Sequence, residues 1–329
     1  MFTSSAEVLN ELYAYKRSVI LMAACKEGLF FEIGKKPISA EDYAAKKGWK
    51  IPQTVVFLRL LKEQGLLEFR DGKYHCSNLS KKFLDDNSES YLGYLVKLET
   101  KIYHEMIDDN SIIKGLKGVS TPLPSDCEDI YMKAMEYGVK YAAVVIVKLV
   151  KKYITVNKVL DLGGGPGEIA ATFCKLCKNS SAVVFDLPEM RSYAQENVVN
   201  KQMEKKIQLI SGDCLIDNWG KNYDVIVISN LLHFFDKNNI VEILNKAYKA
   251  LNYNGIVVVH DFFTGEESTE IAELSVIDWL VMGVAFDYTL NEFADSVELE
   301  TNFKVIERRK LNGPPTSLIV LQASSREES

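Results

Sequence analysis

The stretch "VLDLGGGPGEIAATF", residues 159–173, decides the fold of this 329-residue chain. An apolar, β-branched run ends at Asp161, four glycines follow within six positions, and a helix-like apolar pattern comes next. Glycines at such a turn permit positive φ angles and let a ligand approach the backbone, while the start of a helix offers free N–H groups. The stretch therefore predicts a strand–loop–helix unit that binds a small molecule through Gly163, Gly165 and Gly167.

Two ligands fit the glycine pattern. Gly165 begins the pattern G-x-G-x-x-A, and Asp186 follows about 20 residues later, as in a site for NAD. A second register, D-x-G-x-G-x-G, begins at Asp161. A carboxylate at the end of the strand repels a pyrophosphate and suits a cationic ligand such as S-adenosylmethionine, which carries an amino group, a sulfonium and no phosphate.

The second half of the chain alternates strands with helices. Short apolar, β-branched runs recur with helical stretches between them, which predicts an α/β fold with a parallel, Rossmann-like sheet covered on both faces. The runs are "KVLDLG", "SAVVFDL", "IQLISGD", "YDVIVISNLL" and "GIVVVHDFF". We place the domain boundary near residue 150, with a mainly α-helical domain over 1–150 and the α/β domain over 151–329.

Three successive predicted strands end in an acidic residue. Asp161 suits the amino group of the ligand, Asp186 suits the two hydroxyls of a ribose, and Asp213 or its neighbouring backbone suits the amino group of adenine. Because parallel strands end at one edge of a sheet, these side chains should share one site. The expected cofactor residues are Asp161, Gly163, Gly165, Gly167, Asp186, Leu187, Asp213, Cys214 and Ser229.

The first half of the chain has the pattern of a winged helix. The spacing of the apolar residues predicts an amphipathic helix over residues 5–27. Residues 37–84 are predicted to form two helices followed by a hairpin that turns at Asp71-Gly72. The second of these two helices is mostly apolar and offers few basic residues, so we expect it to pack or to form a homodimer and not to bind nucleic acid.

Composition favours a soluble, cytoplasmic protein. The net charge is −6, 47% of the residues are hydrophobic, and no apolar run reaches the roughly 18 residues that cross a bilayer. The N-terminus lacks the apolar segment of a signal peptide. The six scattered cysteines suggest reduced thiols, and the single C-x-x-C, Cys174 and Cys177, is expected to lie in a helix and to hold no metal.

The chain resembles the class I S-adenosylmethionine-dependent methyltransferases. The resemblance rests on "VLDLGGGPG", "VVFDLP", "GD" and "ISNLLHFFDKNNIVEILNKAYKALNYNGIVVVHDFF" and covers nearly the whole chain. It is closest to small-molecule O-methyltransferases with an N-terminal winged-helix dimerisation domain, such as plant caffeate and bacterial polyketide and phenazine O-methyltransferases. This implies methyl transfer to a hydroxyl of a small aromatic or polycyclic metabolite.

His233 is the candidate general base. It follows the fourth predicted strand at the edge where the ligand should lie, and a neutral imidazole can accept a hydroxyl proton near pH 7. The resemblance implies the same role, and it implies that Asp261 and Asp287 orient the imidazole. The chain departs from the family at Phe234, where the family has an aspartate, and at Ser229, where the plant enzymes have a lysine.

Contacts with the methyl acceptor are expected from two helical segments that are rich in aromatic residues and methionine, a lining that suits a flat apolar molecule. The residues are Tyr131, Met135, Trp279, Met282 and Phe286. Methylation of carbon or nitrogen, a winged-helix regulator that senses a ligand and an NAD-dependent dehydrogenase are the alternatives to an O-methyltransferase.

Overall fold

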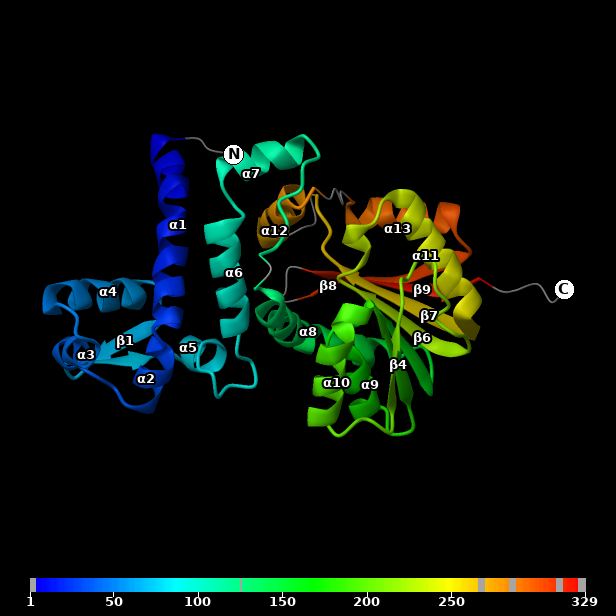
Figure 1. Cartoon of the computed structure of the whole chain (residues 1–329), viewed down its shortest axis with the longest axis horizontal. Coiled ribbons are helices and arrows are strands. Elements are labelled where there is room, and N and C mark those ends of the chain that lie inside the picture. Colours follow the sequence, from blue (N-terminus) through cyan, green and yellow to red (C-terminus); the bar gives the residue numbers. More distant parts are fainter. Residues whose placement is uncertain (1–3, 125, 266–269, 284–287, 312–315, 325–329) are drawn as a thin grey trace. The chain divides into compact units, whose positions relative to one another are not determined.

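The structure is a computed structural model, and it describes residues 4–124, 126–265, 270–283, 288–311 and 316–324 (Figure 1). The chain divides into two compact units, Met1–Lys101 and Ile102–Ser329. The boundary predicted near residue 150 marks the change from helical to α/β sequence, and it stays a prediction. The two compact units divide after Lys101, so residues 102–150 belong to the second unit. No helix among the described residues is both long enough and apolar enough to cross a bilayer.

The first unit contains the winged helix. Its elements are α1 (Ser5–Lys26), α2 (Leu29–Lys35), α3 (Ala40–Lys47), α4 (Ile51–Glu63), β1 (Leu67–Arg70), β2 (Lys73–Cys76), α5 (Asn78–Phe83) and the first part of α6 (Gly93–Glu105). Strands β1 and β2 form an antiparallel hairpin, turned at Asp71 and Gly72 with φ angles of 50° and 73°. Both angles are positive, as the Asp-Gly pair predicts for a tight hairpin turn.

The second unit is built around a seven-stranded sheet. Its further elements are α7 (Asp109–Leu116), α8 (Glu128–Val150), β3 (Lys158–Leu162), α9 (Glu168–Leu176), β4 (Ser181–Asp186), η1 (Pro188–Met190), α10 (Arg191–Asn200), β5 (Ile207–Ser211), β6 (Tyr223–Ser229), η2 (Leu232–Phe234), α11 (Lys237–Ala250), β7 (Leu251–Asp261), α12 (Glu270–Val281), α13 (Leu290–Glu300), β8 (Phe303–Lys310) and β9 (Ser317–Ala323). The strand order is β5-β4-β3-β6-β7-β9-β8. Strands β3 to β7 are parallel, as predicted, whereas β8 and β9 add an antiparallel edge.

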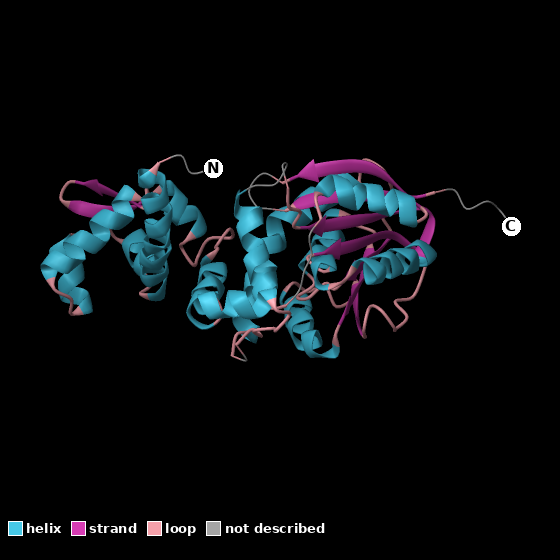
Figure 2. Ribbon diagram, turned by 90° about the horizontal axis from the view of Figure 1, so that it is seen from above, coloured by secondary structure: helices cyan, strands magenta, loops and turns pink. Residues whose placement is uncertain are grey.

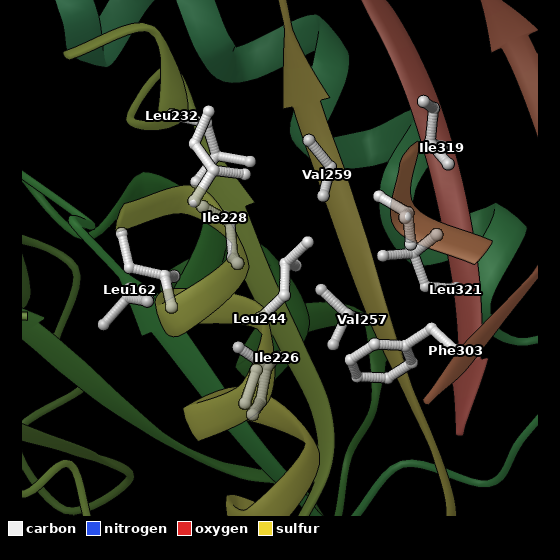
Figure 3. Close-up of a cluster of buried hydrophobic side chains, with 14 of the residues drawn as sticks. Leu162, Ile226, Ile228, Leu232, Leu244, Val257, Val259, Phe303, Ile319 and Leu321 are labelled. Atoms are coloured by element: carbon white, nitrogen blue, oxygen red, sulfur yellow. The ribbon is translucent and has the colours of Figure 1, made fainter. Parts of the chain in front are cut away.

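Helices cover both faces of this sheet, which confirms the predicted α/β class (Figure 2). Alternate residues of a strand point to opposite faces. Leu160 and Leu162 therefore pack with α11 and α13, whereas Val159 packs with α8, α9 and α10. Figure 3 shows the first of these cores, where Leu244 of α11 and Phe303 lie among the side chains of β6, β7 and β9.

The order of the strands reverses direction at β3. From β3 the chain continues outward to β4 and β5, and then returns to the other side of β3 with β6 and β7. Ligands of open parallel sheets bind at such a reversal, outside the carboxyl ends of the strands. The predicted site residues at the ends of β3 to β7 all lie along this edge.

Candidate functional site

The loop after β3 depends on its glycines. Gly163, Gly165 and Gly167 have φ angles of 66°, 49° and 75°, which disfavour any residue with a side chain. Gly164 is required for space, because a Cβ atom there would lie 2.8 Å from Cγ of Asp161 and 3.0 Å from Cγ1 of Val184. The loop therefore lies directly on the carboxylate that precedes it, and the side chain of Leu231 lies against Gly163.

Asp161 is a buried carboxylate that is only half satisfied. Its side chain points to the face covered by α9, where Oδ2 accepts a hydrogen bond from the Ala170 N–H at 3.0 Å, and the residue is 1% exposed. No described residue bonds Oδ1. Burial, which disfavours the charged form, raises the pKa of Asp161 to about 7. A cationic group next to Oδ1 would supply the missing partner and favour the carboxylate.

Asp186, at the end of β4, is bonded to the glycine loop. Its Oδ2 accepts from the Gly165 N–H at 2.6 Å, and its Oδ1 accepts from the Leu187 N–H at 2.7 Å. Burial raises the pKa of Asp186 above its ordinary range, and the two N–H groups act in the opposite direction. The structure thus joins the ends of β3 and β4 through this carboxylate, while the side chain of Leu187 is exposed.

The loop after β5 carries Asp213 and Cys214 and has a defined shape. Asp213 Oδ1 accepts from the Leu215 N–H at 2.8 Å, and the Asp213 N–H donates to Oδ2 of Asp217 at 2.8 Å. Cys214 is buried, and burial raises the pKa of its thiol to about 11, so the thiol is neutral near pH 7. The Cys214 carbonyl accepts from Nε1 of Trp219 at 3.0 Å.

Lys246 of α11 fixes the same loop from outside, and sequence reasoning did not identify it. Its ammonium group donates to the carbonyls of Cys214 and Leu215 at 2.7 Å each and of Asp217 at 3.1 Å. It also lies 4.7 Å from the centre of the Trp219 ring. A lysine about 30 residues from its partners leaves no signal in a sequence pattern.

Ser229 ends β6 inside a buried chain of hydrogen bonds. Its hydroxyl bonds Nδ1 of His260 at 2.7 Å, and Nε2 of His260 bonds the hydroxyl of Thr316 at 2.8 Å. Burial lowers the pKa of His260 to about 4, so this imidazole is neutral near pH 7. The chain of bonds links β6 to β7 and to the start of β9. Thr316 was not predicted, since it lies far along the sequence from both partners.

His233 and Asp261 form a buried pair at the ends of β6 and β7. Nδ1 of His233 lies 2.7 Å from Oδ1 of Asp261, and the two residues are 4% and 0% exposed. Asp261 also accepts from the N–H groups of Leu232 at 3.1 Å and Phe262 at 2.9 Å. The carboxylate is thus held from three sides and presents one oxygen to the imidazole. The structure brings together the two residues that the sequence analysis assigned to base and orienting acid.

The predicted acceptor residues fall into two groups. Met132 of α8 lies against the glycine loop, with its Cε 3.5 Å from the position of a Cβ on Gly165. Its neighbour Tyr131 has a pKa raised by burial and by the charge of Asp186, and Met135 of the same helix is half-buried. Helix α8 therefore passes the expected cofactor residues.

Helix α12 carries the second group. Trp279 is 6% exposed and stacks on the imidazole of His233, with ring centres 4.4 Å apart and planes 28° apart. Met282, just after α12, is half-buried. Phe286 and Asp287 lie outside the described residues.

Comparison with known proteins gives a consistent family. The family model of an O-methyltransferase domain matches residues 123–287. The tetracenomycin polyketide synthesis 8-O-methyl transferase TcmO of Streptomyces glaucescens is 24% identical over 334 residues, which cover 95% of each chain. The N,N-dimethyltransferase OxyT of Streptomyces rimosus is 23% identical over 91% of this chain and 90% of its own. The crystal structure of human N-acetylserotonin methyltransferase in complex with SAM superposes with a TM-score of 0.80 at 18% identity, over 98% of this chain and 99% of that one.

Proposed function

The chain belongs to the family of S-adenosylmethionine-dependent O-methyltransferases, and from that premise we propose that it methylates a hydroxyl of a small aromatic or polycyclic metabolite, with His233 as general base. The observation that carries the proposal is the buried pair of His233 and Asp261 at 2.7 Å, on the sheet edge that also holds Asp161 and Asp186. An imidazole held by a carboxylate is suited to accept a hydroxyl proton.

The residues at this edge fit the cofactor. The partnerless Oδ1 of Asp161 suits the amino group of the amino-acid part, and Asp186 suits the ribose hydroxyls. The glycines of the loop between them would let a ligand approach the backbone, and the loop of Asp213 and Cys214 would border the adenine. S-adenosylmethionine bound there supplies a methyl group activated by a positively charged sulfur.

The protein's part in the reaction is to hold the acceptor and remove its proton. Asp261 accepts from Nδ1 of His233, which leaves Nε2 with the lone pair that takes the proton from the acceptor hydroxyl. The carboxylate then stabilises the imidazolium that forms. Burial of the pair excludes water and fixes the direction of the imidazole, so the remaining contribution is correct placement of the acceptor oxygen.

The acceptor is proposed to lie between α8 and α12. Tyr131 and Met135 come from the first helix, and Trp279 and Met282 come from the second helix and the turn after it. Aromatic and methionine side chains favour a flat apolar ring system. A hydroxyl on that ring system is the proposed methyl acceptor.

Methyl transfer from labelled S-adenosylmethionine to a panel of phenols, with amines as a parallel set, tests the proposed function. Amines belong in the panel because the relative OxyT is an N,N-dimethyltransferase. Labelled methyl ethers are the expected products. Products methylated only on nitrogen or carbon would contradict an O-methyltransferase, and the same panel would show which alternative holds.

The raised pKa of Asp161 gives cofactor binding a pH dependence. A cationic amino group needs the carboxylate form, and at pH 6 a group with a pKa of about 7 must first lose its proton. The affinity for S-adenosylhomocysteine should therefore rise about tenfold from pH 6 to pH 8, with proton release at the lower pH. Calorimetry in two buffers of different ionisation enthalpy measures both. The Asp161→Asn variant should lose the pH dependence, and equal proton release by that variant would refute the assignment.

We propose a homodimer formed through the N-terminal unit, with a second copy of the chain covering α1. The proposal is supported by large apolar side chains that α1 exposes along most of its length, more than a solvated helix face carries. These residues are Val8, Leu9, Leu12, Tyr13, Tyr15 and Val19, which are 37% to 63% exposed.

Light scattering at micromolar concentration should give the mass of a dimer, and Leu12→Glu should shift it toward a monomer, because a charge would be buried in the interface. Leu299→Glu is the matched control, since Leu299 is an isolated residue of α13 that is 85% exposed. A monomer in the unchanged protein would refute the dimer.

The cysteines that the structure describes form no disulfide bond. Free thiols persist in a reducing compartment, which supports a cytoplasmic location as the proposed site of action.

A further inference from the structure

The imidazole of His233 lies among three aromatic side chains, Phe234, Phe262 and Trp279, which we call the aromatic cage. We propose that this cage, and Trp279 above all, favours the protonated form of His233 and fixes the plane of its ring, so that Trp279 is a positioning residue for proton removal. The proposal deepens the proposed function and rests on it in one respect, the role of His233 as base.

The rings come from three separate elements. Trp279 of α12 stacks on the imidazole at 4.4 Å and 28°, and Phe234 of η2 lies at 4.3 Å and 51°. Phe262, just after β7, lies at 6.4 Å and 75° from the imidazole and contacts Trp279 edge-on at 5.0 Å and 69°. The edge-on contact supports the indole from the side, so the position of Trp279 over His233 is itself held.

Asp261 and the cage restrain the ring in different ways. The hydrogen bond to Asp261 fixes Nδ1 but leaves the ring free to turn about that contact. A ring stacked on one face of the imidazole removes this freedom. The second ring nitrogen of His233, Nε2, has no hydrogen bond to any described residue. The direction of Nε2 is therefore set by packing as well as by the carboxylate.

The cage also distinguishes the two protonation states. The face of an aromatic ring attracts a cation and attracts a neutral ring less, and the effect grows when water is excluded. His233 and Trp279 are 4% and 6% exposed, so little water replaces this contact. The imidazolium that forms when His233 accepts a proton is thus stabilised by Trp279 in addition to Asp261.

Among the side chains that the structure describes, few titratable groups belong to the packed elements. Asp261 of β7 contacts the imidazole directly. His260 of β7 has both ring nitrogens bonded to Ser229 and Thr316, and it is neutral near pH 7 because burial lowers its pKa to about 4. Asp278, which precedes Trp279 on α12, has a pKa raised by burial to about 6 and therefore adds its negative charge above that pH. Asp236, beyond η2, caps α11 through the Asn239 N–H.

The test compares Trp279→Leu with Trp279→Phe in the protein without ligand. Leucine keeps an apolar contact but removes the aromatic face, whereas phenylalanine keeps it. NMR titration of the histidine ring protons, assigned with His233→Gln, gives the pKa of His233 in each protein. We expect Trp279→Leu to lower this pKa by about 0.5 to 1 unit, and Trp279→Phe to restore most of the difference.

Kinetics provide a second measurement. The acid limb of the profile of kcat/KM against pH reports the base of the free enzyme. It should move to lower pH in Trp279→Leu by the same amount as the NMR titration, together with a loss in kcat. Trp49→Leu is the control, since it removes a tryptophan from the other compact unit and should leave the pKa of His233 unchanged.

An unchanged or higher pKa of His233 in a folded Trp279→Leu variant overturns the proposal, whatever happens to the activity. If that variant does not fold, Phe262→Leu removes the supporting ring instead, and a lowered pKa with rescue by Phe262→Tyr is then the expected result. Unchanged activity of His233→Gln would overturn only the proposed role of His233 as general base. The NMR titration would still decide whether the cage favours the protonated imidazole.

Discussion

Replacement of His233 by alanine should lower kcat for methyl transfer by about 100- to 10,000-fold, which is the range that a positioned general base contributes. The acceptor hydroxyl would then have no group to receive its proton in a site closed to water. Binding of S-adenosylhomocysteine should change little, because most of the expected cofactor contacts lie at or after the ends of β3, β4 and β5. Single-turnover kinetics and calorimetry on the same preparation measure the two effects.

Asp261→Asn is the companion variant. Asparagine has the shape of aspartate but only one oxygen. It can therefore accept from only one of the N–H groups of Leu232, bonded to Oδ2, and Phe262, bonded to Oδ1, and it lacks the charge that stabilises an imidazolium. It should lose part of the rate that His233→Ala loses, and the double variant should be no slower than His233→Ala. Two losses that multiply would mean that Asp261 acts independently of the imidazole.

Replacement of Asp186 by alanine should raise the dissociation constant of S-adenosylhomocysteine by about 100-fold. Hydrogen bonds to a charged acceptor contribute about 1.5 to 3 kcal/mol each, and 1.4 kcal/mol corresponds to a factor of ten. The variant would lose the proposed ribose contact together with the bond that holds the Gly165 N–H at 2.6 Å. Calorimetry at one pH gives the change directly.

Glu189→Ala is the matched control, because Glu189 is an exposed acid three residues further along the chain. It removes the same charge from the same region without touching the glycine loop. An equal loss in both variants would assign the effect to net charge and not to a ribose contact. Full binding by Asp186→Ala would show that the cofactor contacts the protein elsewhere.

The central strands could be predicted because burial on both faces makes them continuous apolar runs. The run "YDVIVIS" becomes β6, which is buried throughout. The antiparallel edge could not be predicted in the same way. Strand β8 has the sequence "FKVIERRK", in which charges interrupt any apolar run. Charged side chains on an edge strand discourage pairing with another chain, so the property that protects the edge also hides it in the sequence.

Some residues of the candidate site could likewise be predicted from the sequence, and others could not. Asp161, Asp186 and His233 could be placed from the sequence because each follows a recognisable strand, and strand ends of a parallel sheet converge. The partners that shape the site could not. Lys246 reaches three carbonyls of a loop about 30 residues away, and the stack of Trp279 on the imidazole depends on how α12 packs. Such contacts arise only once the elements assemble.

The residues proposed to bind the cofactor and those proposed to bind the acceptor come from different parts of the chain. The residues proposed to hold the cofactor form one continuous segment, from Asp161 to Ser229, on strands β3 to β6. Those proposed to contact the acceptor come from α8 before it and α12 after it. Exchanging α12 would therefore alter acceptor preference, whereas α8 also contacts the glycine loop through Met132. The fold is thereby suited to diversification of its products from a constant source of methyl groups.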